Sequence, residues 1–132
     1  MMKKLQKTIP AIALVIALSL GGSTEARAWS QTKGVSLSLR FTGSTANCNY
    51  RVTGLRGTKK ITATMRLKDV TGGEIRMVKR WGDLKEDGAV LSGSRRIKVS
   101  KRHTYKLVLS AKVYNAQNDA ERVTDSMKQK CS

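Results

Sequence analysis

The stretch YKLVLSAKV, residues 105–113, alternates apolar and polar side chains more regularly than any other part of the chain. One parity carries the apolar residues Tyr105, Leu107, Leu109, Ala111 and Val113. The other parity carries Lys106, Ser110 and Lys112, with Val108 as its one apolar residue. Successive side chains of an extended backbone point to opposite sides, so this stretch predicts a β-strand with one face in a core and the other in solvent.

Similar alternation continues on both sides of this stretch. It predicts six more strands, over residues 35–41, 46–52, 61–67, 75–81, 91–99 and 123–131. The intervals between them are rich in Gly, Ser, Thr and Asn, as turns are, and GDLKEDG at residues 82–88 is expected to be a polar connection. The strand over 75–81 is less regular, because Lys79 lies on the parity of its apolar residues.

Short strands at this spacing, without helical segments between them, predict an all-β fold. A single antiparallel two-sheet sandwich of immunoglobulin-like character, with about seven strands, fits best. A small Greek-key barrel is the alternative. The 132-residue length supports one small domain, and residues 29–132 contain no Pro that would bar a strand from the centre of a sheet.

Residues 1–28 have the three zones of an export signal. Lys3, Lys4 and Lys7 form a basic start, residues 9–20 form an apolar run, and Ala26-Arg27-Ala28 provides small residues before a cleavage site. The apolar run is shorter than the roughly 20 residues of a membrane-spanning helix, although an uncleaved anchor is the alternative. We therefore expect a domain over residues 29–132 that is secreted to the extracellular space and is associated with a cell wall.

The chain is strongly basic, with 26 Lys and Arg against 9 Asp and Glu and a formal net charge of +17 at pH 7. Solubility of a small domain needs a magnitude of only about 2 to 8. The excess predicts polyanionic partners, such as anionic cell-surface polymers, and an anionic membrane surface would suit the same charge. Aromatic residues make up only 5% of the chain, too few for the stacking platforms of a sequence-specific nucleic-acid binder.

The densest basic run is RRIKVSKR, residues 95–102. Its candidate ligand-binding residues are Arg95, Arg96, Lys98, Lys101 and Arg102. Arg96 and Lys98 are expected on the outer face of a strand, and Lys101 and Arg102 in the following turn. These residues would act as delocalised counter-charges and not as a pocket, whereas a merely solvated strand face is the alternative interpretation.

Together these features predict a non-catalytic secreted domain that binds anionic extracellular surfaces. A cationic antimicrobial or toxin-like protein acting on membranes is the alternative, although the amphipathic basic helix typical of that class is not visible. No catalytic residue, metal ligand or cofactor site is predicted. The single histidine, His103, has no acid near it in the sequence, and the acids of residues 83–87 lack the spacing of a calcium loop.

Cys48 and Cys131 are the only cysteines. Both share the parity of apolar residues in their strands, and in a chain of reversing strands the second strand begins at the end of the sandwich where the seventh finishes. Because an exported protein meets an oxidising environment, we expect a disulfide between Cys48 and Cys131.

A further set of residues and motifs is spread over most of residues 29–132: Asn47-Cys48, Gly54, residues 59–65 (KKITATM), Trp81, residues 103–107 (HTYKL), Val113-Tyr114 and Cys131. In these residues the chain resembles a group of small exported β-sandwich proteins of Gram-positive bacteria that have no established activity. The resemblance implies the immunoglobulin-like fold, export and the disulfide, and it adds no site residues.

Overall fold

The computed structural model describes residues 29–132, so the predicted signal peptide over residues 1–28 lies outside the described part of the chain. Seven β-strands and one short 3-10 turn follow one another along it. The strands are β2 (Thr32–Thr42), β3 (Thr45–Gly54), β4 (Lys60–Asp69), β5 (Arg76–Asp87), β6 (Val90–Lys98), β7 (Thr104–Tyr114) and β8 (Ala120–Lys130). The 3-10 turn, Thr71–Gly73, lies between β4 and β5.

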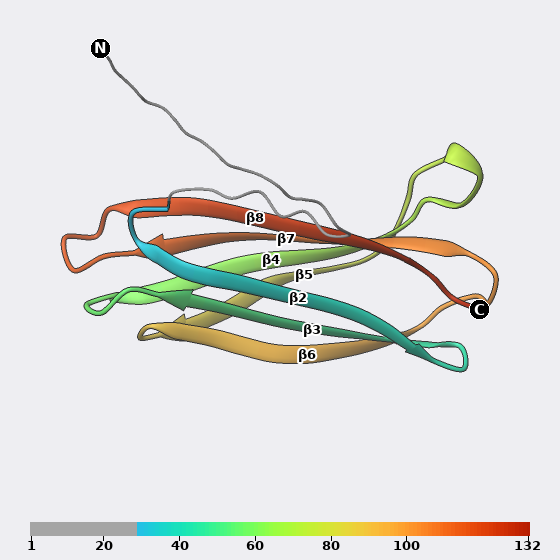
Figure 1. Cartoon of the computed structure of the whole chain (residues 1–132), viewed down its shortest axis with the longest axis horizontal. Helices are drawn as coiled ribbons and strands as arrows, with labels where there is room; N and C mark the ends of the chain where they lie inside the picture. Colours follow the sequence, from blue (N-terminus) through green and yellow to red (C-terminus); the bar gives the residue numbers. More distant parts are fainter. Residues whose placement is uncertain (1–28) are drawn as a thin grey trace, which may run out of the picture.

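The strands form two antiparallel sheets that pack face to face (Figure 1). One sheet has three strands in the order β2-β3-β6, and the other has four in the order β5-β4-β7-β8. The two-sheet sandwich is therefore confirmed, and the barrel alternative is wrong. β5 pairs with β4 and not with β6, so the longer sheet has β4 and β7 at its centre.

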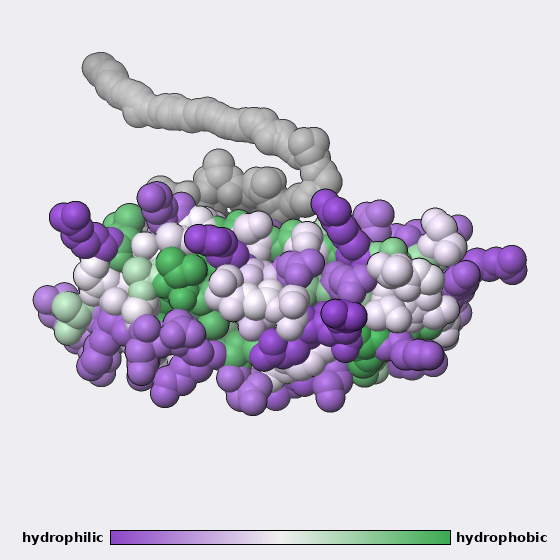
Figure 2. All heavy atoms as spheres, turned by 90° about the horizontal axis from the view of Figure 1, so that it is seen from below, coloured by the Kyte–Doolittle hydropathy of each residue, from purple (hydrophilic) through white to green (hydrophobic). Residues whose placement is uncertain are grey.

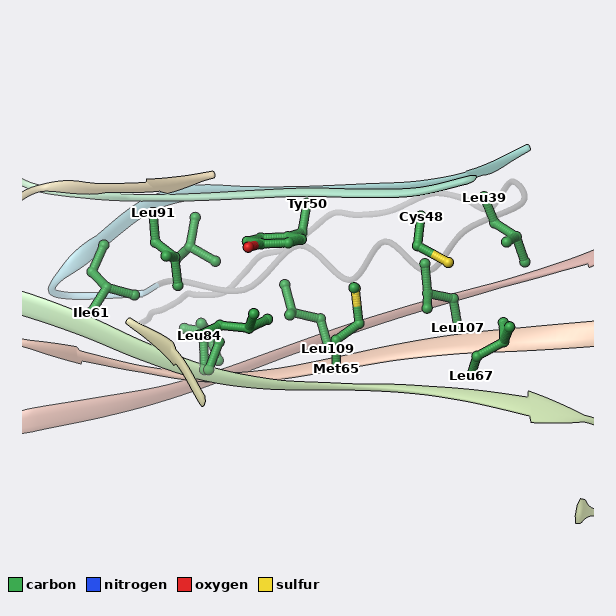
Figure 3. Close-up of a cluster of buried hydrophobic side chains, with 14 of the residues drawn as sticks. Leu39, Cys48, Tyr50, Ile61, Met65, Leu67, Leu84, Leu91, Leu107 and Leu109 are labelled. Atoms are coloured by element: carbon green, nitrogen blue, oxygen red, sulfur yellow. The ribbon is translucent and has the colours of Figure 1, made fainter. Parts of the chain in front are cut away.

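The core lies between the sheets and consists of alternate residues from both (Figure 3). Leu107, Leu109 and Val113 of β7 are fully buried, as the alternation in 105–113 predicts. Tyr105, at the start of β7, is also buried, and its hydroxyl accepts a hydrogen bond from Ser100 N at 2.8 Å and donates to Ser100 O at 3.3 Å. This side chain therefore fixes the corner between β6 and β7.

β5 differs from the strand that the sequence predicts. The polar connection expected at residues 82–88 lies mostly within the strand, because β5 is an edge strand and an edge accommodates charged residues. The pairing with β4 shifts register between Ala63 and Met65 and again between Leu67 and Lys68. As a result Leu84 faces the core at 3% exposure, and Ile75, which the sequence placed in this strand, lies just before it and is 72% exposed.

The predicted disulfide between Cys48 and Cys131 is wrong, because both cysteines are buried free thiols. Cys131 does reach the expected end of the sandwich, where its thiol donates to the carbonyl of Gly43 at 3.5 Å. Cys48, however, lies three residues beyond the start of β3, or about 10 Å along the strand. Parity therefore placed both residues in the core correctly but did not fix their depth, and a disulfide needs Cβ atoms about 4 Å apart.

Candidate anion-binding surface

The basic residues of the run 95–102 do not all lie on the same surface of the domain. Arg96 and Lys98 are exposed on the outer side of β6, as predicted. Arg95 has the opposite parity: it pairs with Cys48 in the sheet, its guanidinium lies 5.9 Å from the centre of the Tyr50 ring, and it donates to the carbonyl of Ser94.

The remaining two candidates of this run lie beyond the strand. Lys101 and Arg102 are in the turn before β7, where Arg102 has a φ of 70° and its backbone N–H donates to the carbonyl of Cys131. The five candidates therefore follow one edge and one turn and do not share a single face.

A larger set of basic residues shares the outer side of the four-stranded sheet, which we call the cationic face. Its outward positions on β4, β7 and β8 alternate with the buried positions of those strands. The basic residues among them are Lys60, Arg66, Lys68, Lys106, Lys112, Arg122, Lys128 and Lys130. Strand β5 adds Arg80 and Lys85 at the edge. No outward position of β4, β7 or β8 carries a carboxylate.

The strand register sets like charges directly opposite one another on this face. Lys68 pairs with Lys106, and Lys106 pairs with Lys128, so three lysines form one row across β4, β7 and β8. Two further pairs, Arg66 with Arg80 and Lys112 with Arg122, repeat the arrangement. Within residues 29–132 none of these side chains lies within ion-pair distance of a carboxylate. Like charges directly opposite across a sheet are destabilising, so the sheet has this arrangement at a cost.

The outer side of the three-stranded sheet has a different composition. Its central strand β3 presents Thr45, Asn47, Asn49, Arg51 and Thr53. The view from the β6 side of the molecule shows hydrophilic side chains interrupted by small apolar areas (Figure 2). The strand pairing places basic residues such as Arg40, Arg51 and Arg96 on this side too, but uncharged polar residues separate them across the strands.

His103 does have a nearby acid, which the sequence reasoning missed. Its Nδ1 lies 2.6 Å from Oδ2 of Asp69, a residue 34 positions earlier that is only 5% exposed. The Asp69 carboxylate also accepts hydrogen bonds from the backbone and hydroxyl of Thr71 and from Arg76 Nη2. Burial alone would raise the pKa of Asp69, but the hydrogen bonds from Thr71 and His103 hold it well below its usual range.

The contacts of Asp69 indicate that this residue has a structural role. Asp69 ends β4, Thr71 lies in the 3-10 turn and His103 precedes β7, so the carboxylate ties three segments together at one end of the four-stranded sheet. The hydroxyl of Thr71 also accepts from the backbone N–H of Thr104, which joins the turn directly to β7. The hydrogen-bond partners of the carboxylate thus lie in the 3-10 turn, at the start of β5 and just before β7.

Glu121, which is partly exposed, forms a second anchor, between the two sheets. Its carboxylate accepts hydrogen bonds from the backbone N–H groups of Ser30 and Gln31 and from the hydroxyls of Ser30 and Thr32. Burial would raise the pKa of Glu121, but these donors lower it. Because Thr32 begins β2 and Glu121 lies in β8, this carboxylate fastens the edge of one sheet to the edge of the other.

Residues 29–132 include no group of three or more His, Cys, Asp or Glu side chains arranged to hold a metal ion. Across the same residues no helix has the length and apolarity to span a membrane. Comparison of the sequence with models of known protein families and with curated proteins finds no match. The two-sheet architecture agrees with the β-sandwich fold that the resemblance implies, but these comparisons do not place the chain in a family.

Proposed function

We propose that this domain is a non-catalytic, secreted protein that binds polyanions through its cationic face. The row of Lys68, Lys106 and Lys128 is the observation that carries the proposal. A sheet that must only be soluble has no reason to set lysines directly opposite one another, since Ser or Thr at one position would remove the repulsion. A polyanion lying across the strands offsets that repulsion and releases its own counterions on binding.

The partners that suit this surface are anionic polymers outside the cell, with cell-wall polymers as the main class. Affinity would come from delocalised contacts along three neighbouring strands, so it would be strongly salt-dependent and weakly selective. The aromatic side chains support this choice over nucleic acid: Tyr50 and Tyr105 are buried, and the ring of Tyr114 on the cationic face has the Lys60 ammonium 4.7 Å above it. None of these three tyrosine rings offers a free platform for bases.

We include in the proposal a relationship to immunoglobulin-like domains. The corner fixed by Tyr105, whose hydroxyl bonds to the backbone of Ser100, resembles the tyrosine corner that links the fifth and sixth strands of many such sandwiches. The fourth strand lies beside the third here, whereas in constant-type immunoglobulin domains it lies beside the fifth.

The test compares two variants that have the same net charge as each other and differ in which outer face has lost three positive charges. The variant Lys68→Gln/Lys106→Gln/Lys128→Gln removes three charges from the cationic face, and Arg40→Gln/Arg51→Gln/Arg96→Gln removes three from the other face. Binding to inorganic polyphosphate is measured by calorimetry over a series of salt concentrations. We expect the salt slope of the first variant to fall by about 2, at about 0.7 per phosphate contact, and that of the second to fall by less than about 0.7.

Equal losses in the two variants would show that the net charge, and not the cationic face, determines binding. Because Arg96 belongs to the basic run of residues 95–102, the second variant also tests part of the site predicted from the sequence. Leakage of dye from vesicles of anionic lipid at the same protein concentrations would contradict the proposal and favour the membrane-active alternative.

A further inference from the structure

A groove of about 450 Å³ crosses the middle of the cationic face. Its lining includes three hydroxyl side chains that lie directly opposite one another on β4, β7 and β8: Thr64, Ser110 and Thr124. Within residues 29–132 none of these hydroxyls hydrogen-bonds to another group of the protein. The groove therefore presents a row of hydroxyls that are free to donate to, or accept from, a ligand.

Cationic rows lie on both sides of the hydroxyl row. Lys112 and Arg122, which are paired across β7 and β8 and line the groove, come two residues away along the strands, or about 7 Å. Arg66 and Arg80 come two residues away in the other direction. The Arg80 guanidinium folds back over Gly82, another lining residue, since a Cβ added there would lie only 2.6 Å from Arg80 Nη1.

This arrangement suits a ligand that carries both negative charge and hydroxyl groups. Arginine forms paired hydrogen bonds with phosphate oxygens and lysine neutralises them as a point charge. A chain bearing only phosphates or carboxylates would use the cations but would leave the hydroxyl row without partners. A polyol or sugar has hydroxyls that can both donate to and accept from threonine and serine side chains.

We propose that this groove binds one phosphorylated polyol or sugar unit of the polyanion, with the phosphate on Lys112 and Arg122 and the ligand hydroxyls on Thr64, Ser110 and Thr124. This inference rests on the proposed function, because it assigns the repeating unit recognised by the same face. It adds selectivity to a surface whose charges alone would bind any polyanion.

The closing experiment removes the hydroxyls without changing charge or shape. In Thr64→Val/Thr124→Val each threonine is replaced by its isostere, and valine suits an outward strand position. The matched control, Thr45→Val/Thr53→Val, makes the same change on the outer side of β3. Glycerol 1-phosphate and inorganic phosphate are titrated into the isotopically labelled protein, and binding is followed through backbone amide chemical shifts.

We expect glycerol 1-phosphate to shift the amides of residues around the groove and to bind more tightly than inorganic phosphate. The Thr64→Val/Thr124→Val variant should lose at least about fivefold in affinity for glycerol 1-phosphate, as removal of two hydrogen bonds implies, while the control keeps the wild-type affinity. Ser110→Ala provides a second, milder variant if the double change perturbs the amide spectrum of the free protein.

The outcomes separate the two proposals. If the groove variants bind glycerol 1-phosphate as the wild type does while polyphosphate binding persists, the groove inference is wrong and the polyanion proposal stands. If the wild type binds glycerol 1-phosphate in the groove but does not bind polyphosphate, the polyanion proposal is wrong and the groove is a site for a small polyol phosphate. Vesicles containing phosphatidylglycerol, compared with vesicles of phosphatidylcholine alone, show whether a lipid headgroup can supply the same polyol phosphate.

Discussion

The outer faces of the two sheets both carry polar side chains, but they differ in how those side chains meet across the strands. On the three-stranded sheet, polar side chains pair with one another across β2 and β3: Asn47 donates to Thr42 and Asn49 to Ser38. On the four-stranded sheet, the outward lysines and arginines of β4, β7 and β8 have no carboxylate partners within the described chain and meet one another across the strands. The first face shows that uncharged polar residues can separate the basic ones on a sheet surface of this chain, so solubility does not explain the directly opposed cations of the second.

One apolar core supports both faces. The inward residues of β3 and β7 meet between the sheets, and the outward residues of the same strands form the two surfaces. Because inward and outward positions alternate, surface charge can be changed with little effect on packing, and packing can be tested with little effect on charge.

The largest expected effect concerns how the two sheets are held together. Cys48 and Cys131 are buried free thiols, and burial raises the pKa of Cys48 to about 11, so neither should react in the folded state. We expect Ellman's reagent to label the native protein at least about a thousandfold more slowly than the unfolded one, since labelling requires opening. Unfolding without a reductant should expose two thiols per chain, and if thiols appear only after reduction the sheets are cross-linked.

The next effect comes from the hydrogen-bonded carboxylates of Asp69, which is buried, and Glu121, which is partly exposed. At pH 7, Asp69→Asn should lower the free energy of unfolding by about 1 to 3 kcal/mol, because it weakens hydrogen bonds made to a charged, buried group. The exposed Asp83→Asn is the control and should change it by less than about 0.5 kcal/mol. Urea unfolding monitored by circular dichroism measures both.

The pH dependence has a definite sign. The pKa values of Asp69 and Glu121 are lower in the folded state than in the unfolded state, so the stability they contribute is present above the unfolded values of about 4. It is lost as the pH falls through the folded values, because the folded state then takes up protons that the unfolded state already holds. The destabilisation by Asp69→Asn should therefore narrow as the pH is lowered from 7 towards 2, and a difference that stays constant would contradict this role of the carboxylate.

Alternation in the sequence was sufficient to predict seven strands and, except in β5, which side of the strand faces the core. It succeeded best in β7, where all five apolar residues of the predicted parity are buried, and failed in β5, where two register shifts change the parity and bring Leu84 into the core. The distance of Cys48 from the end of the sandwich depends on where β3 begins. The turn residues in the sequence do not determine that position alone. The local sequence therefore predicts which face of a strand is buried better than it predicts the register between neighbouring strands.

The candidate surface depends on register, which explains why the sequence pointed elsewhere. A basic run such as residues 95–102 is visible in the sequence, but strand geometry disperses it. Lys68, Lys106 and Lys128 come from three separate strands and become neighbours only through pairing. The contact between His103 and Asp69, 34 residues apart, is hidden for the same reason.

The smallest expected effect on stability gives the sharpest comparison of the two faces. Lys106→Glu would turn two like-charge pairs, with Lys68 and Lys128, into opposite-charge pairs, and should raise the free energy of unfolding by about 0.5 to 1 kcal/mol. Asn47→Glu is the matched control, because Asn47 lies between Arg40 and Arg96 in the same geometry.

Both substitutions add a carboxylate between two cations, but only Lys106→Glu also removes a repulsion. Lys106→Glu should therefore stabilise the domain more and weaken polyphosphate binding strongly, whereas Asn47→Glu should stabilise it slightly and leave binding nearly unchanged. Thermal unfolding and calorimetric titration of the two variants measure both quantities. If Lys106→Glu stabilises the domain without weakening binding, the repulsion across β4, β7 and β8 has no connection with a ligand. If it weakens binding while gaining stability, the sheet is less stable than it could be because those positions are used to bind a polyanion.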